Sequence, residues 1–238
     1  MYDAFTLEKL DKVAMNRYAT PISMTLQCGG TLLAGCSNGT LEVFSFHQRN
    51  ITKANAMNNE IPVPYSGEIY SIHVSDDIQA EIALCTFSGL FFGKFDIGPQ
   101  GRPYQVWVTT KVYFREKLCS AICQLKPNYF LVAEYSRPGY WLIDRRQPAE
   151  DKPPVKIEDE RAEHNSGCTD LQILPMYEET KFPYIISRNK FKIDIIDLVD
   201  KYIFTLCEES NTSTMTQKMA IATSRQPTGH SIEIYFAC

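Results

Sequence analysis

The clearest pattern of apolar and polar residues in this chain is a pair of short strands around a tight turn, between Thr31 and Phe46. Residues 31–36 form a nearly unbroken apolar run, which is typical of a strand buried on both faces. Residues 37–40 are Ser-Asn-Gly-Thr, and Asn and Gly both tolerate the positive φ that a tight hairpin needs. Residues 41–46 then alternate between two faces and are rich in strand-forming side chains. The stretch therefore predicts a β-hairpin.

The same pattern recurs along the chain, each time as an apolar run, a serine, a turn and a second apolar strand. Successive serines are about 50 residues apart, with a shorter last step, and such a period with four strands per repeat is typical of a β-propeller. We therefore expect an all-β fold with four-stranded antiparallel blades. The later strand pairs are expected at 82–88 and 90–96, 130–136 and 140–144, 184–187 and 191–197, and 219–224 and 231–236; the recurring serines are Ser37, Ser88, Ser136, Ser187 and Ser224.

The first hairpin resembles a known repeat. Residues 37–44, Ser-Asn-Gly-Thr-Leu-Glu-Val-Phe, are similar to the second half of a WD repeat, Ser-x-Asp/Asn-Gly-Thr-Ile/Leu-x-Val-Trp-Asp, with Phe44 in place of Trp and Ser45 in place of Asp. No copy keeps Trp-Asp or shows the family's Gly-His. The resemblance covers nearly the whole chain and implies a divergent, WD-repeat-like propeller, whose strand-ending aspartates make turn hydrogen bonds. In the later copies these positions are Phe95-Asp96, Ile143-Asp144 and, two residues further from the serine, Ile196-Asp197.

A single propeller domain is expected over residues 1–238, and the WD-repeat resemblance implies that residues 4–12 could close the last blade. Five blades would fill the chain; alternatively, it is part of a larger, seven-bladed ring. Residues 48–60 are expected to be a loop, and residues 147–166 an acidic, proline-containing loop with a possible short strand at 155–157. The expected blades are 18–64, 65–113, 114–160, 165–208 and 212–238.

The composition of the 238 residues is that of an ordinary globular protein, with 44% hydrophobic and 22% charged residues and a formal net charge of −4. The negative balance argues against general attraction to nucleic acid or to an anionic membrane. There is no apolar run of about 18 residues and no basic-then-apolar start, so we expect a cytoplasmic protein without membrane insertion. The eight cysteines contain no Cys-x-x-Cys pair and are expected to be buried, reduced thiols.

Three of the recurring serines are followed directly by an arginine, namely Arg137, Arg188 and Arg225. Repetition around a propeller would place these side chains on one face, near the mouth of the central channel. There they could bind a carboxylate or a phosphate of a partner through forked hydrogen bonds. The alternative is that they are solvated turn residues. The expected partners are other proteins, through acidic or phosphorylated segments.

Candidate residues for catalysis or metal binding do not form a consistent set. No histidine stands recurrently beside the serines, which are expected to form turns rather than to act as nucleophiles. The close pairs His164 with Cys168 and Cys119 with Cys123 lack a matching second pair, so no metal or other cofactor is expected.

The resulting functional hypothesis is a non-catalytic protein-interaction scaffold within a multiprotein assembly. One alternative is a regulatory propeller of a larger protein, such as a kinase or a trafficking factor. A second alternative is a propeller hydrolase or lyase with an active site in the channel.

Overall fold

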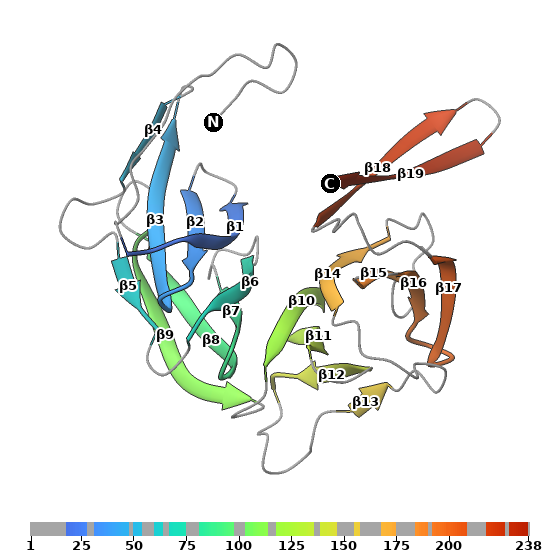
Figure 1. The fold of residues 1–238 in the computed structure, drawn as a ribbon, viewed down its shortest axis with the longest axis horizontal. Helices are drawn as coiled ribbons and strands as arrows, with labels where there is room; N and C mark the ends of the chain where they lie inside the picture. The colour runs from blue at the N-terminus through green and yellow to red at the C-terminus, as the bar shows by residue number, and fades with distance from the viewer. Residues whose placement is uncertain are drawn as a thin grey trace. The chain divides into compact units, whose positions relative to one another are not determined.

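The computed structural model describes residues 18–27, 31–47, 50–53, 60–63, 67–74, 81–97, 103–113, 118–135, 139–146, 155–157, 168–174, 184–189, 192–208, 218–226 and 229–237. The chain divides into two compact units, Met1–Cys119 and Ser120–Cys238, and each is described by itself. Every regular element among the described residues is a β-strand, and all the pairings recorded between them are antiparallel (Figure 1). The expected all-β class is confirmed. The single domain over residues 1–238 stays a prediction, and residues 4–12 lie outside the described residues.

The first sheet of the first unit contains β1 (Pro21–Gln27), β2 (Thr31–Cys36), β3 (Thr40–His47), β4 (Asn50–Lys53) and β5 (Glu60–Pro62). The strands β1 to β4 are neighbours in chain order, and β5 also pairs with β3. β4 lies against the end of β3 and β5 against its beginning, so two short strands share one edge. The expected loop over residues 48–60 is therefore wrong at β4. Its polar composition is that of an edge strand, which tolerates charged side chains and proline.

The second sheet of the first unit contains β6 (Ile69–Val74), β7 (Glu81–Thr86), β8 (Gly89–Ile97) and β9 (Pro103–Tyr113), again in chain order. The hairpin between β7 and β8 is closed by Thr86, which is fully buried. Its Oγ1 donates to the carbonyl oxygen of Gly89 at 2.9 Å and accepts from the backbone N–H of Ser88 at 3.2 Å. Both predicted hairpins of this unit are confirmed, with Ser37 and Ser88 in their turns.

The second unit begins with two four-stranded sheets in chain order, drawn in yellow-green and orange in Figure 1. The first contains β10 (Cys119–Lys126), β11 (Tyr129–Glu134), β12 (Tyr140–Asp144) and β13 (Val155–Ile157). The second contains β14 (Cys168–Ile173), β15 (Ile185–Asn189), β16 (Lys192–Asp197) and β17 (Tyr202–Glu208). A pair, β18 (Lys218–Gln226) with β19 (Gly229–Ala237), follows. The predicted short strand at residues 155–157 is confirmed.

The last two hairpins turn two residues later than expected. β15 continues past Ser187 to Asn189, and β18 continues past Ser224 to Gln226. Both serines therefore lie inside strands instead of in turns. The longer β15 accounts for the two-residue delay of Ile196-Asp197 in the fourth copy, because Ile185 pairs with Ile196 across the lengthened hairpin.

An irregularity of strand pairing also recurs between the sheets. The register of the first strand shifts after its first residue in β1, β6 and β14, at Pro21/Ser23, Ile69/Ser71 and Cys168/Asp170. A bulge at a fixed place bends each first strand in the same way. The internal repeat thus extends to details of pairing that the apolar pattern alone does not reveal.

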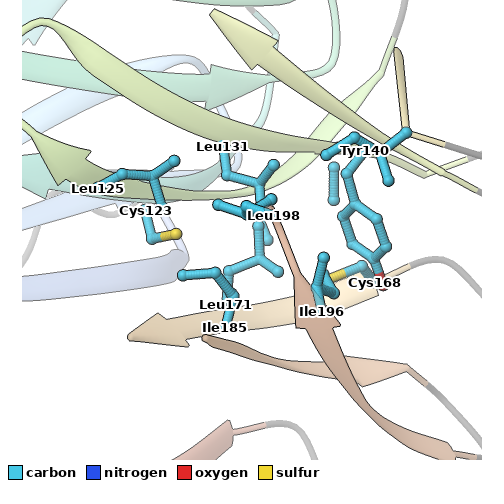
Figure 2. Packing of buried hydrophobic residues seen from close by; sticks show 12 residues of the cluster. Cys123, Leu125, Leu131, Tyr140, Cys168, Leu171, Ile185, Ile196 and Leu198 are labelled. Carbon is cyan, nitrogen blue, oxygen red and sulfur yellow. The ribbon is translucent and has the colours of Figure 1, made fainter. Parts of the chain in front are cut away.

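Each unit has an apolar core between its sheets. In the first unit, Leu33, Leu41 and Val43 of the first sheet pack with Ile82, Leu84 and other residues of the second. In the second unit, Figure 2 shows Leu131 and Tyr140 of the β10–β13 sheet facing Leu171, Ile185 and Ile196 of the β14–β17 sheet. The expected buried thiols are confirmed for Cys36, Cys85, Cys119, Cys123 and Cys168. Burial raises the pKa of Cys123, so this thiol stays protonated and packs as a small apolar group.

Gly35 lies where the two sheets of the first unit come close together. A Cβ atom placed on Gly35 would lie 2.6 Å from Cγ2 of Ile69 and 2.6 Å from Oγ of Ser23. That serine donates to the carbonyl oxygen of Ile69 at 2.8 Å, a buried hydrogen bond that joins β1 to β6. The glycine lets the backbone of β2 come this close to β6.

We expect Gly35→Ala to destabilise the protein by about 1–3 kcal/mol, because the methyl group overpacks this contact. Ile69→Leu removes the Cγ2 branch that the new methyl would meet. The double variant should therefore lose less stability than the sum of the two single variants. Urea unfolding of the four proteins measures this coupling, and additive losses would contradict a clash between the new methyl group and Cγ2 of Ile69.

Candidate functional site

The three arginines expected to bind a partner do not form a described cluster. Arg137 lies outside the described residues, and for Arg225 the structure describes only the backbone, within β18. Arg188 lies in strand β15 and is 1% exposed, so the expectation of a solvent-facing turn is wrong for this residue. The cause is the longer β15, which puts Arg188 directly opposite Ile193 in the ladder. Partner binding by the three arginines stays a prediction.

Ser187 belongs to a buried hydrogen-bonded chain between the two sheets of the second unit. The hydroxyl groups of Tyr140, from β12, and Ser187, from β15, are 2.5 Å apart. Ser187 Oγ donates to Sγ of Cys168 at 3.4 Å, and this thiol donates to the carbonyl oxygen of Asp170 at 3.2 Å. Burial holds the pKa of Tyr140 well above its ordinary value, so the phenol keeps its proton and can donate to Ser187. The chain of hydrogen bonds fixes one sheet against the other.

Asp194 is the charged centre of the same face of the β14–β17 sheet and is 1% exposed. Its Oδ2 accepts from Nδ2 of Asn189 at 3.0 Å and forms an ion pair with Nζ of Lys192 at 3.1 Å. Its Oδ1 accepts from the hydroxyl of Thr205 at 2.8 Å. Three strands thus share one buried carboxylate, which is the arrangement that a buried charge needs. The cluster is a structural element of this sheet.

Residues 35–39, Gly-Cys-Ser-Asn-Gly, match the Gly-x-Ser-x-Gly pattern of serine hydrolases. That pattern carries a nucleophile when it lies on a turn from a strand to a helix. Here it lies on a hairpin between β2 and β3, and Ser37 Oγ accepts from the backbone N–H of Thr20 at 3.2 Å. Asn38 Oδ1 accepts from the backbone N–H and hydroxyl of Thr40. Ser37 is therefore a turn residue, as expected for the recurring serines.

Two of the three strand-ending aspartates, Asp144 and Asp197, make the turn hydrogen bonds expected of them, and the side chain of Asp96 is not among those that the structure describes. Asp144 Oδ1 accepts from the backbone N–H of Arg146 at 3.1 Å, and Asp197 Oδ1 accepts from that of Val199 at 2.8 Å. The two turns are therefore equivalent, with Arg146 at the position of Val199. This difference in side chain makes the turn after β12 chemically distinct.

A partly exposed group of charged and aromatic side chains surrounds this turn. We call it the basic edge and define it as Lys126, Tyr129, Asp144, Arg145 and Arg146. Lys126 and Tyr129 flank the turn between β10 and β11, Asp144 ends β12, and Arg145 and Arg146 follow it in the next turn. Both turns lie at the same end of the sheet, because β10 to β13 run up and down in chain order.

The basic edge is held rigidly. The backbone N–H of Arg145 donates to the carbonyl oxygen of Asn128 at 2.8 Å, which joins the two turns. Asn128 has a φ of 67°, and asparagine favours this left-handed conformation more than most residues do. Arg146 donates from Nε and Nη2 to the two oxygens of Asp144 at 3.0 and 2.9 Å. Two turns and one guanidinium thus move as a unit.

The Tyr129 ring lies between two cations. Nζ of Lys126 is 4.3 Å from the ring centroid, and Cζ of Arg146 is 4.9 Å from it. Both distances suit cation–π attraction. Arg146 also donates from Nη2 to the Tyr129 hydroxyl. Hydrogen bonds from Arg146 hold the pKa of Asp144 well below its ordinary value, so this carboxylate stays ionised at neutral pH.

Part of the basic edge can be predicted from the sequence. Pro127-Asn128 is a recognisable turn, and Asp144 was identified as a strand-ending aspartate. Since the first and third turns of an up-and-down sheet lie at one end, their neighbours Lys126, Arg145 and Arg146 could have been grouped. The position of Tyr129 between two of these cations depends on side-chain packing and has no signal in the sequence.

Comparison with known proteins shows the fold. No family model matches the chain, and no curated protein matches its sequence. Among solved structures, selenomethionine-substituted virginiamycin B lyase from Staphylococcus aureus is similar with a TM-score of 0.58 and 12% identity, over 92% of this chain and 71% of that chain. A protein of unknown function from Bacteroides caccae is similar with a TM-score of 0.55 and 12% identity, over 85% of this chain and 65% of that chain.

These likenesses, together with the four-stranded antiparallel sheets, show that the fold is a β-propeller. The resemblance to WD repeats stays a prediction, because no family model supports it. Within the described ranges, no three His, Cys, Asp or Glu residues are grouped so that they could hold a metal ion. No helix in the described part of the chain has the length and apolar character needed to cross a bilayer.

We expect Asp194→Ala to destabilise the protein by about 3–5 kcal/mol, because it leaves Lys192 and Asn189 without their buried acceptor. Asp200→Ala is the matched control. That aspartate is exposed in the turn after β16, so its loss should change stability by less than about 0.5 kcal/mol. Urea unfolding compares the two variants, and equal losses would refute the structural role of Asp194.

We expect Arg146→Gln to raise the pKa of Asp144 toward the ordinary aspartate value of about 3.9. A carboxylate whose pKa is lowered by folding adds stability above its unfolded-state pKa. That contribution is lost as the pH falls from about 4 through the folded-state value. NMR titration of the Asp144 carboxyl carbon measures both proteins, with Lys201→Gln as a control. An unchanged titration midpoint in Arg146→Gln would show that Arg146 does not hold Asp144 ionised.

Proposed function

We propose that this propeller is a non-catalytic protein-interaction module that acts within a multiprotein assembly. The observation that carries the proposal is the basic edge, a hydrogen-bonded surface in which Lys126 and Arg146 are exposed and Tyr129 and Arg145 are half-buried. The Arg146 side chain is 59% exposed although its guanidinium is fixed by Asp144. Arginine and tyrosine are enriched where protein partners bind, and a rigid side chain loses little entropy on binding.

The described clusters of polar side chains have structural roles, which supports a non-catalytic function. The buried carboxylate of Asp194 and the hydroxyl of Ser187 are engaged in hydrogen bonds within and between sheets. Asp144 and Asp197 serve turns. The WD-repeat-like hairpins of the sequence favour the same use, since that resemblance implies a propeller whose loops contact proteins. The module could equally be one part of a larger regulatory protein.

A propeller lyase is the second candidate. The observation that favours it is the structural likeness to virginiamycin B lyase, which at 12% identity concerns the fold alone. The two candidates differ in a simple assay. Incubation of the purified chain with virginiamycin B, with and without added divalent cations, should leave the substrate intact by liquid chromatography and mass spectrometry. Catalytic turnover of this substrate would overturn the non-catalytic proposal.

Partner binding is tested by site-specific photo-crosslinking. A benzophenone amino acid replaces Lys126, Tyr135 or Tyr202, which are exposed on two different sheets, in cells that produce the chain naturally. Leu131, which is fully buried, is the matched negative position. We expect a discrete cross-linked protein from at least one exposed position and none from Leu131.

The cross-linked protein is then purified and mixed with the chain. A complex of fixed stoichiometry by light scattering, with a measurable affinity by calorimetry, is the expected result. If no protein captured at any exposed position forms a complex with the purified chain, the proposed function is wrong.

A further inference from the structure

We infer that the basic edge binds an acidic segment of a protein partner, with the carboxylates of that segment beside Arg146, Arg145 and Lys126. This inference rests on the proposed function and names the chemistry of the partner. The residues of this site differ from the arginines expected from the sequence, among which Arg188 is buried.

The first argument is the local charge. The basic edge has three cations against one carboxylate, Asp144, although the whole chain has a formal net charge of −4. The equivalent turn of the β14–β17 sheet has the opposite balance, with Asp197 and Asp200 against Lys201. Lys126 ends β10, whereas Arg145 and Arg146 lie in the turn after β12, so the contrast between equivalent turns concerns the two arginines. Such a local contrast orients an acidic partner toward one end of one sheet.

The second argument is the geometry of Arg146. Its Nε and Nη2 groups donate to Asp144, and Nη2 also donates to the Tyr129 hydroxyl. A guanidinium has five N–H donors, so the two on Nη1 remain. No described residue accepts a hydrogen bond from Nη1, and the side chain is 59% exposed. A second carboxylate can therefore bind a guanidinium that is already held in place, without losing the first.

The third argument is the aromatic ring between the cations. Tyr129 packs against the apolar core on one side and contacts Lys126 and Arg146 through its ring. It thereby sets the spacing of the two cations, and it acts as a positioning residue. Fixed cations around an aromatic ring suit a short peptide with neighbouring carboxylates, since the arginine contributes charge and both arginine and tyrosine contribute contact area.

A peptide suits this surface better than a nucleic acid does. Binding to nucleic acid relies on many phosphate contacts along a continuous basic track. The basic edge is limited to the ends of two hairpins and contains the ionised Asp144 beside its arginine. A regular row of phosphates would meet this carboxylate, whereas a peptide can place its acidic side chains around it.

The test is fluorescence anisotropy with a labelled twelve-residue peptide of alternating glutamate and serine, at about 50 mM salt, where charge screening is weak. The matching glutamine–serine peptide is the neutral control. We expect the acidic peptide alone to bind, and its affinity to fall at about 200 mM salt. The single variants Lys126→Gln, Arg145→Gln and Arg146→Gln should each weaken binding about two- to fivefold. The triple variant should weaken it at least about tenfold.

Lys201→Gln is the matched control, because it removes a lysine from the equivalent turn of the neighbouring sheet. Its affinity for the acidic peptide should equal that of the unaltered chain. Tyr129→Phe, which keeps the ring but removes the hydroxyl that holds Arg146, should weaken binding less than Arg146→Gln does. Circular dichroism and urea unfolding confirm that each variant is folded before binding is compared.

Three results would overturn the inference. They are no detectable binding of the acidic peptide at about 50 mM salt, undiminished binding by the triple variant, and tighter binding of a phosphoserine peptide or a twelve-nucleotide oligothymidylate. The proposed function is judged separately, with the partner found by cross-linking. If that partner binds the unaltered chain and the triple variant equally well, the proposed function stands and the acidic-segment inference fails.

Discussion

The constraint on which this structure depends is that its middle strands are buried on both faces. All five residues of β15 are buried, and β11 is buried at every position after Tyr129. A single sheet cannot bury such strands, so each needs another sheet against it, and repetition of the blade meets this need. At Gly35 the sheets pack so closely that the contact between β2 and β6 has no room for a methyl group.

In the second unit, hydrogen bonds compensate for the burial of several polar groups. Tyr140, Ser187 and Cys168 link the two sheets of the second unit through a run of donors and acceptors, and Asp194 is shared among three strands. A recurring serine that suggests a turn in the sequence therefore becomes, at Ser187, part of the contact between sheets. The groups that would attract attention as catalytic candidates are here occupied in holding the fold together.

Residues at strand ends are not packed between sheets, so their side chains can differ from one blade to the next. The turns after β12 and β16 have the same backbone hydrogen bond, made by Asp144 and Asp197. They differ in that Arg146 stands where the second turn has Val199. That substitution, together with Lys126 and Tyr129, turns one end of one sheet into a rigid basic surface. A propeller used for binding can in this way keep its blades alike and vary their edges.

The sequence by itself determined the all-β class, the positions of the first two hairpins and the turn role of Ser37, Ser88, Asp144 and Asp197. These features follow from local alternation and turn chemistry, which act over a few residues. The tertiary structure decided which residues are buried between sheets and which end of a sheet is exposed. The hairpin of β15 and β16 turns two residues later than its serine suggests, and this small extension carries Arg188 from an expected surface into the interior. Such an extension is set by pairing and packing between strands, because a lengthened strand satisfies backbone hydrogen bonds that a turn would leave to solvent.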